Sequence, residues 1–444
     1  MSVPCLDGLR PSLEGVVASV IATCDADGLP NVSMISQVHY VDPDRVALSY
    51  QFFNKTRRNL LATRRASVQI VDPETMQHHR LALAYEDTLT SGPLFESMKA
   101  KLSGIASHHG MDGVFRRLGA DVFRVLAVEA VPGPTIPRPV RPRPLLAATR
   151  RACDALDACA DLEELLDRAT EVLEAQFGIR HSMVFMVEDG EDRLYAVASR
   201  GYRSSGVGAE VTFGEGVIGV AARERTPIRI GHMTREYRYG AAITETARRA
   251  GLIEDVPRTI PFPGLAAPRS QIALPILEGG RLLGVLFAEA EETMRFAYDD
   301  EDALALVAGH LGARIAIQRA VETEDDTATP DLALPLAGGV VVRYYPVDQS
   351  VFVDHDYLIK GVAGAILWRL LQEFQATGRT EFALRELRVD PALRLPAHSE
   401  NLDARMILLR RRLEERQSCL RIEKAGRGRF RLAVACRLTL EGPA

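Results

Sequence analysis

Short stretches of β-forming residues alternate with turn residues over the first part of the chain. Asp27-Gly28 separates two of these stretches, and an Asp-Gly pair between apolar runs is typical of a tight hairpin. The spacing of the later stretches favours antiparallel pairing in a small closed barrel over a parallel sheet. The expected strands are Val16–Thr23, Asn31–Tyr40, Val46–Tyr50, Ala66–Val71, His79–Tyr85 and Ala120–Val131.

Residues 132–144 are rich in proline and predict an extended linker, because closely spaced prolines exclude both helix and strand pairing. Helical periodicity resumes over Leu145–Phe177 and returns over Asp299–Gln318, so residues 145–321 are expected to form a second domain. Its expected strands are His181–Glu188, Arg193–Ser199, Ile228–Ile230, Gln271–Leu277 and Arg281–Ala288.

An acidic and Thr/Pro-containing segment, residues 322–331, predicts a second linker. Residues 332–444 then read as a strand pair, three helices and a closing hairpin. The strands are Val340–Tyr345 and Ser350–Val353, the helices are Val362–Gln375, Glu381–Arg388 and Leu402–Arg416, and the hairpin strands are Arg421–Glu423 and Phe430–Val434. The chain is therefore expected to be a multidomain α+β protein, with its first domain over residues 1–131.

Composition narrows the functional classes. A formal net charge of −5 excludes a generally basic nucleic-acid binder, although one basic surface is compatible with it. The sequence lacks a signal-peptide pattern and a membrane-spanning apolar run, so we expect a cytoplasmic protein. The six cysteines lie apart without a Cys-x-x-Cys pair, which favours reduced thiols over a disulfide framework or a metal site.

The start of a predicted helix in the first domain carries unusual charge. Asn54 can cap this helix, and its first turn holds Lys55, Arg57 and Arg58, where the helix dipole disfavours cations. A bound anion would resolve the conflict, because free backbone N–H groups and cationic side chains together bind phosphate. The alternative is a solvated basic turn.

These residues and the flanking strands resemble the flavin-binding split barrel of the pyridoxamine 5'-phosphate oxidase-like family. The resemblance implies FMN, with Lys55, Thr56 and Arg57 at the family's phosphate-binding segment. Thr56 stands where the family has arginine, and Asn54 and the neighbouring Arg58 complete the expected site. The strand expected beside the flavin ring contributes Ser33, Met34, Ile35, Ser36 and Gln37. The family also includes haem and deazaflavin binders and is usually dimeric, so these cofactors stay as alternatives and a homodimer is expected.

Two histidine pairs, His78-His79 and His108-His109, invite a haem-ligand interpretation. Adjacent histidines on a strand point to opposite faces, so at most one of His78 and His79 could face a cofactor. A structural or surface role is the alternative for all four residues. The first domain has no nucleophile–base pattern, so any chemistry there would be that of a flavin.

The second domain contains a Gly-Glu-Gly turn before a small-residue helix. Gly214 and Gly216 allow a sharp turn, and Thr226-Pro227 stops the helix before the strand at Ile228. With the strand Leu282–Glu289, this pattern resembles a GAF domain, which implies a small-molecule pocket on an antiparallel sheet. The insertion His232–Arg269 lies where a lid over that pocket would be expected.

The third domain is similar to the winged-helix effector domain of response-regulator transcription factors, and the resemblance rests on Asn401–Leu413 and Gly426–Phe430. It implies a recognition helix and a wing that contact double-stranded DNA. Since Leu408, Leu409 and Leu413 must pack inward, arginines on this helix are expected to face outward. The candidate phosphate contacts are Arg405, Arg410, Arg411, Arg412, Arg427 and Arg429. A solvated face and a protein-interaction module are the alternatives.

The order of modules indicates a one-component regulator, in which a flavin barrel and a GAF pocket bias how a winged helix engages DNA. One competing hypothesis is an FMN-dependent oxidoreductase with regulatory GAF and winged-helix domains. Another makes the barrel a cofactorless relic in a protein–protein adaptor. The sequence alone leaves open whether the protein is an enzyme.

Overall fold

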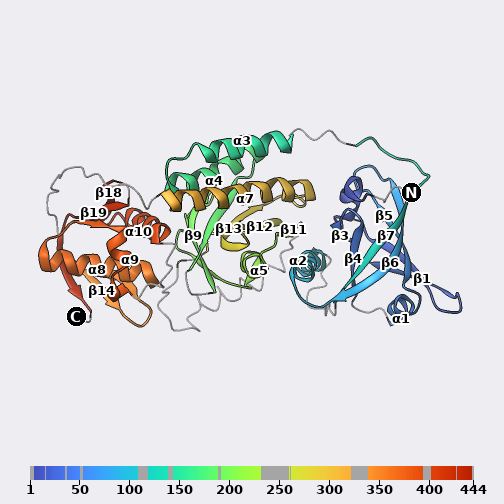
Figure 1. The fold of residues 1–444 in the computed structure, drawn as a ribbon, viewed down its shortest axis with the longest axis horizontal. Coiled ribbons are helices and arrows are strands. Elements are labelled where there is room, and N and C mark those ends of the chain that lie inside the picture. The colour runs from blue at the N-terminus through green and yellow to red at the C-terminus, as the bar shows by residue number, and fades with distance from the viewer. Residues whose placement is uncertain are drawn as a thin grey trace.

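The computed structural model describes residues 5–15, 17–35, 38–50, 54–108, 119–138, 144–188, 192–231, 260, 262–321, 339–393, 402–426 and 428–442. Three domains follow one another along the long axis of the molecule, with the N-terminal domain at one end and the C-terminal domain at the other (Figure 1). Within the described residues, no helix is both long and apolar enough to cross a membrane.

The N-terminal domain is built on a seven-stranded sheet of order β2-β1-β5-β6-β7-β4-β3, in which every described pairing is antiparallel. Its strands are β1 Ser19–Cys24, β2 Pro30–Ile35, β3 Val38–Asp42, β4 Arg45–Tyr50, β5 Arg65–Val71, β6 His78–Leu89 and β7 Gly119–Val131. The helical elements are η1 Asp7–Leu13, α1 Asn54–Thr63 and α2 Pro93–His108.

The single strand expected over residues 31–40 is wrong, because the structure divides it between the two edge strands β2 and β3. Only two residues separate Ile35 from Val38, so their Cα atoms lie within roughly 11 Å of each other. The sheet must therefore curl until its opposite edges approach, as in a split barrel.

The middle domain has a six-stranded sheet of order β10-β9-β8-β13-β12-β11. Its strands are β8 His181–Val187, β9 Arg193–Arg200, β10 Glu210–Thr212, β11 Ile228–Ile230, β12 Ser270–Glu278 and β13 Arg281–Ala290. The helices are α3 Leu145–Asp157, α4 Leu162–Phe177, α5 Gly216–Glu224 and α7 Tyr298–Val321, and α3, α4 and α7 form a layer over one face of the sheet (Figure 1).

Alternate residues of β8 divide the core of this domain in two. Val184 and Met186 join the cluster under α3, α4 and α7, whereas Met183 and Phe185 join the cluster under α5. This period of two is the one expected for a strand buried on both faces. The single helix expected over residues 145–177 is interrupted, because the Asp161 carboxylate accepts a hydrogen bond from Glu164 N and starts a new helix.

The C-terminal domain contains a four-stranded sheet of order β16-β15-β14-β20 and a three-stranded sheet of order β17-β19-β18. Its strands are β14 Gly339–Tyr345, β15 Ser350–Val353, β16 Asp356–Ile359, β17 Glu381–Ala383, β18 Leu420–Lys424, β19 Arg429–Val434 and β20 Arg437–Glu441. The helices are α8 Gly361–Thr377, α9 Leu384–Arg388 and α10 Leu402–Glu415, with η2 at Pro391–Leu393. The helix expected over residues 381–388 is therefore partly a strand.

The last strand of the chain closes this domain. β20 pairs in parallel with β14, and Glu441 accepts a hydrogen bond from Arg343 Nε at 2.7 Å. Trp368, the one tryptophan of the sequence, stacks on Tyr344 with ring centroids 5.1 Å apart. A Cβ atom placed on Gly442 would lie 2.8 Å from the Trp368 ring, so the chain passes directly over the indole.

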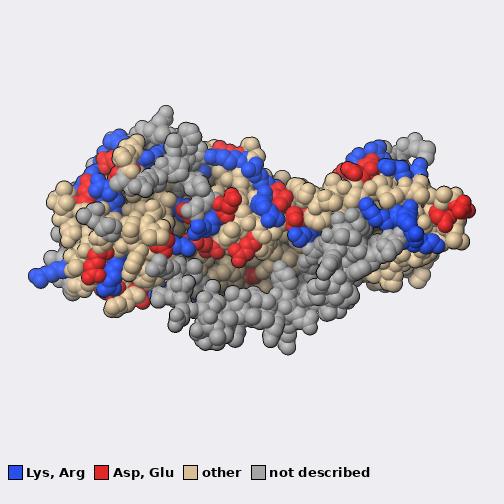
Figure 2. Space-filling view, turned by 90° about the horizontal axis from the view of Figure 1, so that it is seen from below, with Lys and Arg blue, Asp and Glu red and all other residues tan. Residues whose placement is uncertain are grey.

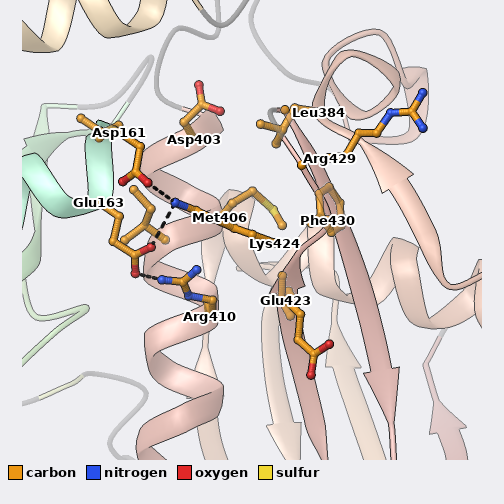
Figure 3. Close-up of a pocket in the computed structure, with 15 residues that line it drawn as sticks. Asp161, Glu163, Leu384, Asp403, Met406, Arg410, Glu423, Lys424, Arg429 and Phe430 are labelled. Carbon is orange, nitrogen blue, oxygen red and sulfur yellow. Dashed lines mark hydrogen bonds and ion pairs between the residues drawn. The ribbon is translucent and has the colours of Figure 1, made fainter. Parts of the chain in front are cut away.

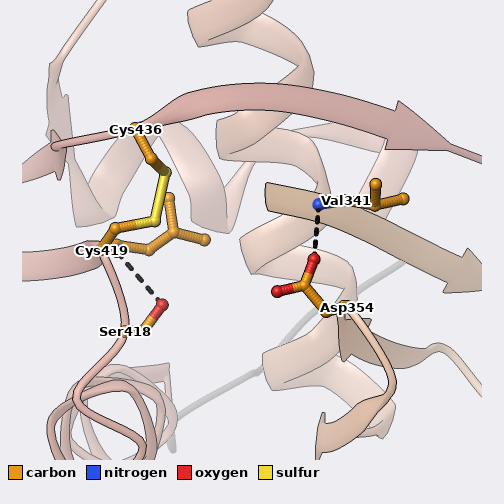
Figure 4. The surroundings of a disulfide bond; sticks show 6 residues. Val341, Asp354, Ser418, Cys419 and Cys436 are labelled. Atoms are coloured by element: carbon orange, nitrogen blue, oxygen red, sulfur yellow. Dashed lines mark hydrogen bonds between the residues drawn. A yellow bond between two sulfur atoms is a disulfide. The ribbon is translucent and has the colours of Figure 1, made fainter. Parts of the chain in front are cut away.

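The expectation that all six cysteines are reduced is wrong. Cys419 and Cys436 form a disulfide (Figure 4). Leu420 pairs with Val434 in the β18–β19 hairpin, and just beyond this pair Ala435 N donates to the carbonyl oxygen of Cys419. Cys436 is the next residue, so the two cysteines meet at the open end of the hairpin with Cα atoms 5.9 Å apart. Their separation of 17 residues hid this pairing from a search for close cysteine spacings.

Candidate functional sites

The first candidate site lies where the start of α1 meets the β1–β2 hairpin. Asn31 Nδ2 donates to Thr56 Oγ1 at 2.8 Å, and the hydroxyls of Ser33 and Thr56 are 2.9 Å apart. Thr56 is buried and Lys55 is half-buried. The structure thus brings together two of the predicted cofactor-binding segments, strand β2 and the first turn of α1.

Arg57 has a partner inside the protein. Its Nη1 lies 2.7 and 2.9 Å from the two carboxylate oxygens of Asp121, and its Nη2 donates to Thr88 Oγ1 at 3.3 Å. Asp121 is almost fully buried, so its charge requires this guanidinium. Arg57 therefore satisfies a buried carboxylate, and the charge for an external anion falls to Lys55 and the exposed Arg58.

The donor set around α1 fits a phosphate group. Backbone N–H groups of the first helical turn, the Lys55 ammonium, the Arg58 guanidinium and the Ser33 hydroxyl can all donate hydrogen bonds to anionic oxygens. Lysine and arginine side chains gather at the barrel end of the face in Figure 2, which is the side that carries α1 in Figure 1. Ser36 and Gln37 lie outside the described residues, as does the side chain of Asn54.

The outer face of the β1–β2 hairpin is apolar and open. Val20 pairs with Met34, Ala22 pairs with Val32, and these side chains share one face of the hairpin. Met34 is 70% exposed and Val32 is 66% exposed, whereas Ile35 on the opposite face is buried. Met34 thus does not point to the same side of the strand as Ser33.

The predicted haem-ligand histidines lie on two elements. His78 and His79 are neighbours in β6, so their side chains take opposite faces, and His78 Nδ1 lies 2.9 Å from Gln69 Nε2. Burial lowers the pKa of His79. His108 ends α2, and His109 lies outside the described residues.

The second candidate site is the face of the GAF sheet opposite α3, α4 and α7. Phe262 stacks on Phe185 with ring centroids 6.3 Å apart and meets Phe287 edge-on at 6.0 Å. The buried Glu289 carboxylate holds the same segment, since it accepts from Leu265 N at 2.6 Å and from Gln271 Nε2 at 2.9 Å. Residues 262–268 of the expected lid therefore cover this face, while residues 232–259 and 261 are outside the described part of the chain.

The third candidate site is α10, which carries four of the predicted DNA-contacting arginines. The expectation that they face outward is wrong, because α10 turns this side toward the GAF domain. Arg405 is only 5% exposed, lies 2.5 Å from the Glu188 carboxylate and sits over the Tyr195 ring at 3.8 Å. Arg412 is also buried, and its Nη1 lies 2.6 Å from Glu415.

Arg410 and Arg411 contact helix α4 of the GAF domain. Arg410 forms an ion pair with Glu163, and Arg411 lies 2.9 Å from Asp167 while it also donates to the carbonyl oxygen of Val197. Arg429 lines a cavity that Arg410 also lines, and Arg427 is not among the described residues.

A cavity of about 90 Å³ lies where α4, α10 and the β18–β19 hairpin meet (Figure 3). Lys424 reaches across it from the hairpin, with its Nζ 2.7 Å from Asp161 and 3.6 Å from Glu163. Residues from both domains therefore line this cavity, and the ion pairs at its edge join them.

The sequence interpretation did not include the carboxylates that meet α10. Asp161 and Glu163 were visible as an acidic helix start, which is favourable on its own because the dipole is positive there. The signal that could have found them is charge complementarity, since an acidic helix start and an arginine-rich helix occur in one chain.

The sequence also did not predict the contact between the barrel and the GAF domain. Arg229 of β11 is 2% exposed, and its guanidinium lies 2.7 Å from Glu14 and 2.7 Å from Glu301. Tyr298 of α7 belongs to the apolar core of the barrel. Burial lowers the pKa of Lys101 on α2 to about 8, with Arg229 as the next cause, and the ammonium sits over the Tyr298 ring at 4.1 Å.

Two family models match separate parts of the chain. A pyridoxamine 5'-phosphate oxidase model matches residues 7–128, and a GAF domain model matches residues 159–316. The N-terminal domain is thus pyridoxamine 5'-phosphate oxidase-like and the middle domain is GAF-like, which confirms both resemblances. A comparison with curated proteins gave no match.

Solved structures show low-level similarity to single domains. The GAF domain of an Acinetobacter phosphoenolpyruvate-protein phosphotransferase is 18% identical with a TM-score of 0.31, and the match covers 40% of this chain and 95% of that chain. The GAF domain of the Coxiella burnetii protein is 24% identical with a TM-score of 0.32, covering 40% and 97%. An FMN-binding protein from Syntrophomonas wolfei subsp. wolfei is 18% identical with a TM-score of 0.25, covering 28% and 84%.

Proposed function

We propose that this protein is a sensor in which a flavin-binding barrel and a GAF ligand pocket control the DNA binding of a winged-helix C-terminal domain. The observation that carries the proposal is the set of elements that flank and contact α10. A helix with four arginines follows α8 and α9, precedes a two-stranded hairpin, and contacts the GAF domain directly. This contact would join the two proposed ligand-binding modules to a basic helix of winged-helix order.

The donor set at the start of α1 supports FMN as the barrel cofactor. Lys55, Arg58, Ser33 and the first-turn N–H groups would hold its phosphate, and FMN supplies redox chemistry when bound. Arg57 instead forms an ion pair with the buried carboxylate of Asp121. Haem and deazaflavin are the other cofactors compatible with the barrel family.

The exposed apolar face of the β1–β2 hairpin supports a homodimer. Val20, Val32 and Met34 would become buried against a second copy, which would remove this apolar surface from water. The aromatic cluster around Phe262 supports a small apolar or aromatic ligand in the GAF domain.

Two measurements test the proposal. The purified protein should show flavin absorbance that is lost in Lys55→Ala plus Arg58→Ala and retained in Arg80→Ala, an exposed arginine on β6 of the same domain. It should also bind a duplex from its own promoter region more tightly than a scrambled duplex, with an affinity that falls steeply with salt. A colourless protein that ignores added flavin, or equal affinity for both duplexes, would contradict it.

The match to the pyridoxamine 5'-phosphate oxidase model favours a second candidate, an FMN-dependent oxidoreductase with regulatory GAF and C-terminal domains. This enzyme would consume a reduced nicotinamide with a turnover in the ordinary enzymatic range. Absence of turnover with a flavin-loaded protein would leave the sensor as the better account.

A further inference from the structure

We propose that the GAF domain holds α10 and the β18–β19 hairpin in a closed state that hides their cationic groups from polyanions. We call Arg405, Arg410, Arg411 and Lys424 the basic surface, and Asp161, Glu163, Asp167 and Glu188 the acidic surface. The inference rests on the proposed function, because it assigns the regulation of the same helix that would contact DNA.

Each cation of the basic surface faces at least one carboxylate of the acidic surface, and Glu163 is shared by Arg410, Arg411 and Lys424. Arg410 pairs with Glu163, and Arg411 pairs with Asp167 at 2.9 Å. Lys424 reaches Asp161 at 2.7 Å, so helix and hairpin are held by the same acidic helix start (Figure 3). These carboxylates occupy donors that phosphate oxygens would otherwise use, and they neutralise the charge that would attract a polyanion.

The acidic surface is suited to reversible contact. Asp167 is 55% exposed, Asp161 is 44% exposed and Lys424 is 50% exposed, so water and salt reach the Arg411–Asp167 and Lys424–Asp161 pairs. Exposed ion pairs contribute little each, and a duplex offers many phosphates to the same groups. The Arg410–Glu163 pair is less accessible, with side chains 21% and 15% exposed, and the Arg405–Glu188 pair is buried and gives the contact its register.

A short loop that contains Gly206 and Gly208 contacts both α10 and the segment that covers the GAF sheet. A Cβ atom placed on Gly206 would lie 2.2 Å from the ring of Pro263, in the segment that packs on that face. One placed on Gly208 would lie 2.4 Å from Ile260 Cδ1 and 3.4 Å from Leu408 Cδ1 of α10. The loop is therefore in direct contact with both.

The same loop is also tied to the end of α10 by a hydrogen bond from Ser205 Oγ to the Glu415 carboxylate. A ligand that displaces Phe262 from Phe185 and Phe287 would move the covering segment. This movement would shift the loop and α10. The ligand would favour the open state only to the extent that it binds the open state more tightly than the closed state.

The test neutralises the acidic surface in the full-length protein with Asp161→Asn, Glu163→Gln and Asp167→Asn. Asparagine keeps the helix cap at position 161. The matched control is Glu164→Gln, Glu171→Gln and Glu174→Gln, which removes the same charge from the same helix, at carboxylates whose ion pairs are with arginines of the GAF domain.

Two readouts separate this inference from the proposed function. Hydrogen exchange of the α10 and β18–β19 amides should accelerate about tenfold in the first variant and stay unchanged in the control. Affinity for a short fluorescent duplex of mixed sequence should rise about tenfold in the first variant only. Accelerated exchange without duplex binding would support the closed state and overturn DNA as its output. Unchanged exchange would overturn the closed state, whatever the duplex does.

A charge swap guards against a simple folding defect. Glu163→Arg alone should open the contact, and Glu163→Arg with Arg410→Glu should restore part of the exchange protection by re-forming the pair, although Lys424 and Arg411 also face position 163. Failure of the swap to restore protection in a folded protein would overturn the role given to this pair.

Discussion

The barrel–GAF contact and the GAF–C-terminal contact both pair arginines with carboxylates, but they differ in how much water reaches them. In the first, Arg229 is 2% exposed and Glu14 is 7% exposed. In the second, Asp167 and Lys424 are about half exposed. A buried charge must keep its partner, whereas an exposed pair can exchange it for water or salt ions.

This difference indicates which contact can work as a switch. Tyr298 of the GAF domain lies in the core of the barrel, so separating these two domains would expose apolar surface as well as charge. The α4–α10 contact has two half-exposed ion pairs, but the apolar cores of the middle and C-terminal domains also form one continuous cluster, so opening it would expose apolar surface too. The proposed release of the third module would therefore depend on exchange of its exposed ion pairs.

The largest expected effect comes from breaking the buried contact. Arg229→Met leaves Glu14 and Glu301 without their guanidinium, which should lower the free energy of unfolding by about 3–5 kcal/mol. Urea unfolding followed by circular dichroism measures it. Arg168→Met, which removes a surface arginine of α4, should cost less than about 1 kcal/mol. Equal losses in both variants would contradict the cost assigned to the burial of Arg229.

The next effect concerns the hairpin that carries Lys424. Cys436→Ser opens a disulfide that spans 17 residues, which should cost the C-terminal domain about 3 kcal/mol. Hydrogen exchange should accelerate in β18 and β19 and remain unchanged in β11 of the barrel–GAF contact. Faster exchange in β11 as well would mean that the two contacts are not independent.

The buried contact should also carry a pH signature. Because the pKa of Lys101 is lowered to about 8, mainly by burial and then by Arg229, the folded protein disfavours its charged form. Between pH 8 and the ordinary lysine pKa of 10.5 the unfolded chain binds more protons, so stability should rise with pH across that window. The rise should be on the order of 3 kcal/mol and absent in Lys101→Met. A rise that persists in Lys101→Met would assign it to another group.

The smallest effect is expected at the exposed contact. Asp167→Asn, at a carboxylate that is 55% exposed, should lower stability by less than about 1 kcal/mol, and the difference from wild type should disappear at high salt. Unfolding at low and high ionic strength measures both. The Arg229→Met loss should persist at high salt, and a loss that fades there would contradict its burial.

Local patterns in the sequence predicted most of the framework. The hairpin at Asp27-Gly28, the strands of the GAF sheet and the α10 helix all follow from periodicity and turn residues. Apart from the helix break at Asp161, which is a local cap, the errors occurred where a distant partner decides the outcome. Residues 31–40 form two strands because the barrel closes through them, and no local signal reports closure.

The same limit applied to the candidate sites. Arg57 appeared available for phosphate, yet Asp121, 64 positions later, holds it. Leucine spacing placed the apolar side of α10 correctly, but spacing within one helix cannot reveal that another domain covers the polar side. The family resemblance assigned Ser33 and Thr56 to separate segments of the cofactor site, and the structure brings their hydroxyls within 2.9 Å of each other.

The position of Trp368 makes intrinsic fluorescence a probe of the C-terminal domain. As the only indole in the sequence, stacked on Tyr344 and covered by the final residues, it dominates the intrinsic emission of the whole protein. Excitation at the red edge of protein absorbance therefore reads one domain of three without any label. Trimming the last strand would wet the indole and shift its emission to longer wavelength.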